Sequence, residues 1–185
     1  KKGSQRRISP VDARYQTGYS KHYRPVGNLC LIHMTIPFSS ISSLSPQQLA
    51  EAVSQAMLAK DHVAQDLNIQ LVSVGAGSAT MSMTVQERML NGFAICHGGY
   101  ITILADTAFA YACNSYNDVT VASSLGIEFI AAVQGGDLLT AVAKEVSLAG
   151  RTGLYDIDVG NQTGKRVAMM RGRSYRLKDK KMIAL

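Results

Sequence analysis

The sequence has no apolar stretch that could cross a membrane without polar interruption, and it holds only three cysteines. A transmembrane helix needs about 20 consecutive apolar residues, so we expect a soluble protein. The odd number of cysteines argues against a disulfide framework. Their apolar surroundings predict reduced thiols in the cytoplasm, at Cys30, Cys96 and Cys113.

Acidic side chains are scarce in residues 1–45, which carry seven basic residues and a single acid, Asp12. The rest of the chain holds equal numbers of acids and bases, so the net charge of +6 belongs to this leader. A basic leader is weak evidence for a nucleic-acid partner. We predict a mostly flexible leader; an organelle transit peptide, or sequence upstream of a natural start at Met34, also fits its composition.

A dinucleotide-binding loop is excluded because the glycine-rich segment 75–78 lacks the third glycine and is followed by an alternating pattern at 79–85. That alternation is typical of a half-buried strand. Together with the apolar run at 69–74 it predicts a β-hairpin. Before the hairpin, we expect a helix from Pro46 toward Leu67, starting at the Ser45 cap.

The longest apolar helical pattern runs over 100–113, where only Thr102, Asp106 and Thr107 are polar. A helix that is apolar on nearly every side must be enclosed by other structure. Asp106 would then lie in a buried helix, where a carboxylate needs compensating partners or has its pKa raised. This cost favours a chemical role, and the alternative is a purely structural carboxylate satisfied by backbone groups or an arginine.

Two consecutive glycines, Gly98 and Gly99, come directly before this helix. Free N–H groups at a helix start suit an anion or a developing oxyanion, although a tight turn explains glycines equally well. From Gly98 to Asp106 the helix rises about 12 Å, which is too far for both residues to touch one carbonyl carbon. A shared reaction centre would need two chains, so we expect a homo-oligomer, at least a dimer and by expectation a tetramer.

Four strand-like segments separated by short turns follow, at 119–133, 138–148, 154–159 and 166–177. Short connections predict antiparallel neighbours, whose sheet needs an apolar cover on one face. The helix at 100–113 is the candidate cover. We therefore predict an α+β fold, an antiparallel sheet wrapped around one long central helix, spanning 46–178 with a short tail at 179–185.

This arrangement is the hotdog fold, and here a family resemblance becomes specific. The chain resembles the phenylacetic-acid-degradation branch of hotdog acyl-CoA thioesterases in MLNGFAICHGGYITILADTAFAYACNS, VASSLGIEFIAAVQGGDLLTA, RTGLYDIDVGNQ and VAMMRGRSYRL. The resemblance covers about residues 60–178. It implies hydrolysis of phenylacetyl-CoA or a related hydroxylated aromatic or medium-chain acyl-CoA, with coenzyme A as part of the substrate and no cofactor or metal.

The resemblance also implies roles for single residues. The Gly98 amide would polarise the thioester carbonyl, and Asp106 would activate water or attack the carbonyl itself. Thr107 would position the water. Asn91 and His97 match residues that line the thioester, although His97 could instead cap the helix.

Coenzyme A brings phosphates and a pantetheine arm, so basic and hydroxyl side chains are expected near the substrate. The candidates for substrate contact are Gly99, Ser123, Ser124, Arg151 and Arg173. No membrane partner is expected.

Two other functions remain open. Hotdog hydratases and dehydratases also place an acid and a histidine across a dimer interface, but their signatures differ from HGG followed by LAD. Some hotdog domains are acyl-CoA-sensing transcriptional regulators fused to a DNA-binding region. Residues 1–45, however, lack the two successive amphipathic helices of a helix-turn-helix.

Overall fold

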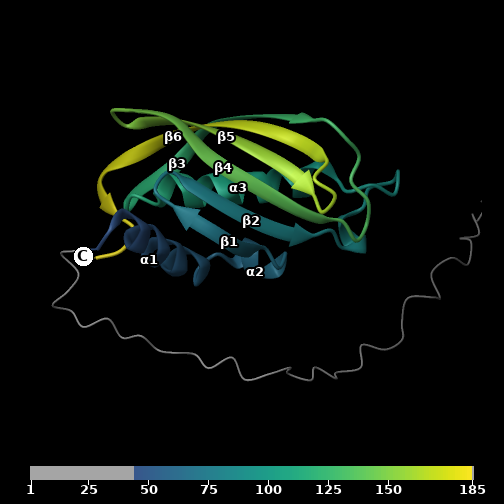
Figure 1. Cartoon of the computed structure of the whole chain (residues 1–185), viewed down its shortest axis with the longest axis horizontal. Coiled ribbons are helices and arrows are strands. Elements are labelled where there is room, and N and C mark those ends of the chain that lie inside the picture. The colour runs from purple at the N-terminus through teal and green to yellow at the C-terminus, as the bar shows by residue number, and fades with distance from the viewer. Residues whose placement is uncertain (1–43, 185) are drawn as a thin grey trace, which may run out of the picture. The chain divides into compact units, whose positions relative to one another are not determined.

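The computed structural model describes residues 44–184, so almost all of the predicted leader lies outside the described part. The elements in chain order are α1 (Pro46–Leu58), α2 (His62–Asp66), β1 (Gln70–Gly75), β2 (Ser78–Thr84), the 3₁₀ helix Glu87–Met89, α3 (Gly98–Asn114), β3 (Asp118–Phe129), β4 (Leu138–Ala149), β5 (Thr152–Asn161) and β6 (Arg166–Lys181) (Figure 1).

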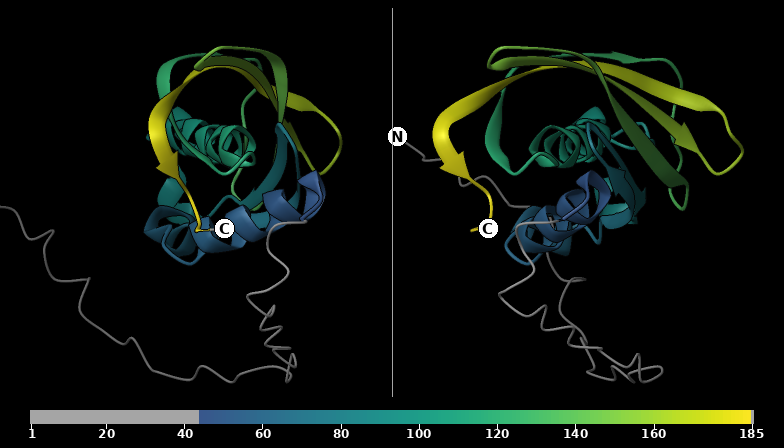
Figure 2. Two further views of the ribbon diagram at one scale, coloured as in Figure 1. Left: turned by 90° about the vertical axis from the view of Figure 1, so that its left-hand side faces the viewer. Right: turned by 60° about the vertical axis from the view of Figure 1, so that its left-hand side comes forward.

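The strands form one six-stranded sheet in the order β1-β2-β4-β5-β6-β3, and every neighbouring pair is antiparallel. Figure 2 shows the sheet curving around α3, with α1 and α2 on the side that the sheet leaves open. The predicted α+β hotdog fold, with an antiparallel sheet around one long helix, is confirmed.

The core forms where α3 meets the inner face of the sheet. Residues along β2 and β5 alternate in burial, which turns Met81, Met83, Tyr155 and Ile157 toward the helix. From α3, the ring of Phe109 packs against that of Tyr155 with centroids 5.3 Å apart. Such a tilted pair adds to the stabilisation from apolar burial.

The N-terminal helix begins as predicted, because Ser45 and Gln48 form a capping box and Pro46 occupies the first turn. The single helix predicted from Pro46 toward Leu67 is wrong. Asp61 accepts a hydrogen bond from the Ala64 N–H at 2.9 Å and so starts a second helix, α2. The other Asp61 oxygen lies 3.5 Å from the Tyr111 hydroxyl on α3.

The strands match the predicted segments, with two differences. The run predicted at 119–133 leaves the sheet after Phe129, because Ile130 and Ala131 both donate to the Val167 carbonyl. At the other end, β6 continues through Lys181, past the residue where the domain was predicted to end.

The two edges of the sheet differ in what lies beside them. At β1, helix α1 packs alongside and Gln47 donates a hydrogen bond to the Val74 carbonyl at 2.8 Å. At β3, β6 is the one partner strand within residues 44–184, and three apolar side chains of β3 are more than 40% exposed, namely Val121, Leu125 and Phe129. An exposed apolar edge of this length is a surface on which another strand can pair.

We expect Gly77→Ala to destabilise the fold. Residue 77 has a φ of +69°, and an added Cβ would lie 2.6 Å from the Tyr116 hydroxyl oxygen. Gly164→Ala is the matched control, because residue 164 has a φ of +78° with open space around it. Left-handed backbone costs an alanine about 1–2 kcal/mol, and overpacking adds about 1–3 kcal/mol. Equal losses of unfolding free energy in urea would contradict the packing argument.

Candidate active site

The start of α3 is fixed by His97, which is its N-cap residue. The His97 Nδ1 atom accepts a hydrogen bond from the Gly99 N–H at 2.9 Å, and the backbone N–H of His97 donates to the Met89 carbonyl at 2.8 Å. His97 therefore caps the helix through Nδ1, and its predicted contact with the thioester stays a prediction. Because Nδ1 is the acceptor, the ring hydrogen of the neutral imidazole lies on Nε2. The His97 side chain is exposed.

Gly98 is the first residue of α3, and its N–H donates no hydrogen bond to any residue within 44–184. A free N–H at a helix start is a donor for a ligand oxygen, strengthened by the helix dipole. The Gly99 N–H differs, since His97 already occupies it. Of the two glycines, Gly98 is the one whose amide can bind a carbonyl oxygen.

Asn91 shapes the loop that leads into this helix. Its Oδ1 accepts from the Phe93 N–H at 2.9 Å, and its backbone N–H donates to the Ile95 carbonyl at 2.8 Å. The side chain is half-buried. Asn91 thus holds the loop closed with its carbonyl oxygen, which leaves its amide NH₂ for a further contact.

A groove of about 390 Å³ has Gly98 among its lining residues. Its walls come from the loop before α3, the first turn of α3 and the segment that follows β3, and the lining residues are Asn91, Ile95, Cys96, Gly98, Ile101 and the five residues from Phe129 to Val133. The apolar run after β3 was predicted as plain strand, so sequence reasoning missed its part in the groove.

Asp106 and Thr107 lie two turns further along α3 and do not line this groove. Asp106 is half-buried, and its carboxylate makes no hydrogen bond or ion pair with any residue of the described chain. Burial raises its pKa above the ordinary aspartate value. The Thr107 hydroxyl donates to the Ile103 carbonyl at 2.8 Å, so toward a water molecule it can act only as an acceptor.

The remaining predicted substrate contacts lie on the sheet. Ser123 and Ser124 are exposed on β3 beside Arg173 of β6, and the Ser123 hydroxyl donates to the Arg173 carbonyl at 3.0 Å. Arg151, at the β4–β5 turn, donates to the Tyr175 hydroxyl at 3.0 Å and lies over its ring. Neither set lines the groove at Gly98.

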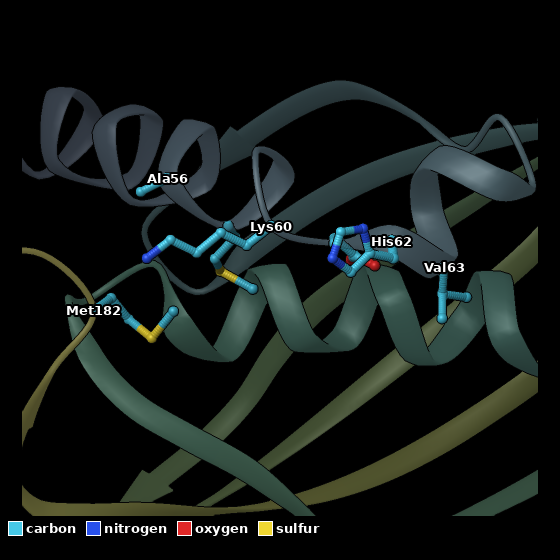
Figure 3. A pocket seen from close by; sticks show the side chains of 7 residues that line it. Ala56, Lys60, His62, Val63 and Met182 are labelled. Atoms are coloured by element: carbon cyan, nitrogen blue, oxygen red, sulfur yellow. The ribbon is translucent and has the colours of Figure 1, made fainter.

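A second cavity, of about 500 Å³, lies between the α1–α2 segment and Met182 near the chain end (Figure 3). It holds none of the predicted site residues.

Cys96 lines the first groove, and burial raises the pKa of its thiol. This disfavours the thiolate that a nucleophile needs. Within residues 44–184, no group of three or more His, Cys, Asp or Glu side chains is placed to hold a metal ion, and no helix is long and apolar enough to span a membrane.

Comparison with known proteins places this arrangement in a family. The thioesterase superfamily matches residues 93–168. Acyl-coenzyme A thioesterase PaaI of Escherichia coli K12 is 46% identical over 124 residues, which cover 67% of this chain and 89% of the relative. The structure of E. coli PaaI, a protein of the phenylacetic acid degradation operon, superposes with a TM-score of 0.71 at 44% identity, covering 72% of this chain and 96% of PaaI.

A more distant structure is that of smu.793 from Streptococcus mutans UA159 bound to acetyl-CoA, with a TM-score of 0.59 and 25% identity over 62% of this chain and 92% of that protein. These matches agree with the fold. The chain belongs to the thioesterase superfamily, among the hotdog-fold acyl-CoA thioesterases of the PaaI type.

Asp106→Asn is expected to raise the melting temperature at neutral pH. Because the folded-state pKa of Asp106 lies above its unfolded value, ionisation costs the folded state stability as pH rises through the folded-state pKa. In acid the carboxyl is protonated in both states, so the two melting curves should converge. Glu87→Gln, at an exposed carboxylate that forms no ion pair with a residue in 44–184, is the control. If Asp106→Asn is no more stable than wild type at neutral pH, burial of the ionised Asp106 carboxylate does not destabilise the fold and the prediction is wrong.

Proposed function

We propose that the protein hydrolyses the thioester of phenylacetyl-CoA or a related aromatic or medium-chain acyl-CoA at a site shared by two subunits. The observation that carries the proposal is that the N–H of Gly98, a residue lining an apolar groove, has no acceptor within residues 44–184. A donor at that point stabilises a carbonyl oxygen that gains charge in the reaction. The name of the E. coli relative supports an acyl-CoA substrate, and the acetyl-CoA bound to the S. mutans neighbour supports coenzyme A recognition.

The reaction has two routes that use the same residues. With Asp106 as general base, its carboxylate takes a proton from water while the water oxygen bonds to the thioester carbon. With Asp106 as nucleophile, the carboxylate attacks that carbon and water then cleaves the mixed anhydride. In both routes the Gly98 N–H holds the oxyanion, the C–S bond breaks, and the products are a carboxylic acid and coenzyme A. His97 Nε2–H and the Asn91 NH₂ are donors for orienting the substrate.

Two features support a site built from two chains. Gly98 and Asp106 are separated by two turns of one helix, and only Gly98 lines the groove. The β3 edge is unpaired by other described strands, and the α3 residues at 102, 103, 106, 107 and 110 are only half-buried. A second copy pairing at β3 would cover this surface and bring its own α3 close to the first. We propose a homo-oligomer of at least two subunits, with a tetramer as the expected assembly.

The substrate's coenzyme A moiety requires cationic partners for its phosphates. Arg173 is exposed on β6 and forms no ion pair with a residue in the described range, so we assign it first. Arg151 is a weaker candidate, because it already stacks on Tyr175.

A mixed-subunit assay tests the shared site. Asp106→Asn alone should lower phenylacetyl-CoA turnover by at least about 100-fold, the usual contribution of a general base, while the fold and substrate binding persist. Gly98→Pro should also be inactive, because proline lacks the amide hydrogen, and proline is tolerated at the first helical position. After subunit exchange, a random dimer population should regain about a quarter of wild-type turnover, since half the dimers hold one intact site of two.

Gly98→Ala is the matched control, because alanine adds a Cβ as proline does but keeps the N–H donor. It should retain more activity than Gly98→Pro. Absence of recovery in a mixture whose subunits are shown to exchange would count against a shared site. Wild-type turnover by Asp106→Asn would overturn the assigned chemistry.

The pH profile of kcat/KM provides a separate test. Only ionised Asp106 can act as base or nucleophile, so activity should fall as pH drops through the Asp106 pKa. Burial raises that pKa above the ordinary aspartate value of about 3.9, so the acid limb should lie above it. Circular dichroism across the same range would show that the chain stays folded. A profile that stays flat until the protein unfolds would contradict the role of Asp106.

A further inference from the structure

The backbone conformation of residue 98 does not require a glycine, but its surroundings do. Its φ is not positive, so an L-residue could adopt its conformation at the first position of α3. A Cβ added there, however, would lie 2.8 Å from Cζ and 3.1 Å from Cε1 of Phe129. The ring of Phe129 therefore fills the space directly beside Gly98, which lines the groove.

Phe129 is well placed to act on whatever binds there. It is the last residue of β3, paired with Ala168 of β6, so the strand fixes its backbone. Its side chain is nonetheless 53% exposed. The outer end of the ring, at Cζ and the two Cε atoms, thus lies against Gly98. Much of the ring surface is free, in a groove whose other apolar side chains include Ile95, Ile101, Ile130 and Val133.

The distance from the Gly98 amide limits what the ring can contact. A carbonyl oxygen bound to that N–H would lie about 2.9 Å from the nitrogen. The acyl group attached to that carbonyl would then enter the groove that Gly98 and Phe129 both line. An aromatic wall favours a flat aromatic group over a short aliphatic one, because it offers both apolar area and ring–ring contact.

We propose that Phe129 is a specificity-determining residue, whose ring forms the wall of the acyl subsite at Gly98 and selects aromatic acyl groups over short aliphatic ones. This inference rests on the proposed thioester hydrolysis at Gly98. It also explains the glycine at position 98, since a larger residue would push the ring into the space the acyl group occupies.

The test measures kcat/KM of wild type and Phe129→Ala with phenylacetyl-CoA, hexanoyl-CoA and acetyl-CoA. The ratio of phenylacetyl-CoA to acetyl-CoA should fall by at least about tenfold, the usual range for apolar pocket contacts. Phe93→Ala is the matched control, since Phe93 is an 86% exposed aromatic residue on the loop before α3 that does not line the groove. Its ratio should stay at the wild-type value.

A pair of variants tests the contact itself. Gly98→Ala should lower the same ratio because its Cβ displaces the Phe129 ring, and adding Gly98→Ala to Phe129→Ala should lower it no further. Additive losses would show that the two residues act independently and would overturn the proposal. Light scattering on each variant would show whether the oligomer persists.

The other outcomes are equally decisive. An equal loss for all three substrates, or a loss of the oligomer together with activity, would assign Phe129 to the pantetheine path or to a subunit interface and overturn the specificity role. If the wild type is active and Phe129→Ala has the same substrate ratio, the inference is refuted and the thioesterase proposal stands. A folded wild-type chain that cleaves none of the three substrates overturns both.

Discussion

The structure depends on burying α3 against the inner face of the sheet. The helix carries apolar side chains on most of its circumference, and one six-stranded antiparallel sheet curves far enough to cover the larger part of it. Small residues allow this close approach. Gly172 of β6 lies against the ring of Phe109, where a Cβ would be 3.1 Å away. The stability of the domain and the position of the site therefore have the same origin.

The same packing leaves one stripe of α3 incompletely covered. The two polar groups that reduce stability lie on this stripe and at the helix start. Asp106 is half-buried without a partner in the described chain, and the Gly98 amide lacks an acceptor. Groups of this kind reduce stability unless a ligand or a second subunit satisfies them. The end of the open β3 edge lies at the start of α3, because Phe129, the last residue of β3, is packed beside Gly98.

Local patterns were sufficient for most of the fold. Alternation in β2, the capping signal at Ser45 and the glycine turn at Gly77 each act within a few residues, and all three appear in the structure. The break between α1 and α2 was missed because the Asp61 cap, which accepts from the Ala64 N–H, was not weighed against the continuing apolar pattern. Asp61 also lies 3.5 Å from the Tyr111 hydroxyl, fifty residues away. Propensity alone does not weigh such a contact.

The sequence by itself determined the hotdog architecture, the family, and the candidates Gly98 and Asp106, because periodicity and a dense motif record which faces are buried. Only the tertiary structure decided which of these groups are available. The Gly99 N–H is bonded to His97, whereas the Gly98 N–H has no acceptor within residues 44–184. Ser123 and Arg151 do not line the groove. The tertiary structure also brought Phe129 onto Gly98 from thirty-one residues along the chain. Contacts of that range arise from strand pairing and core packing, which no local pattern specifies.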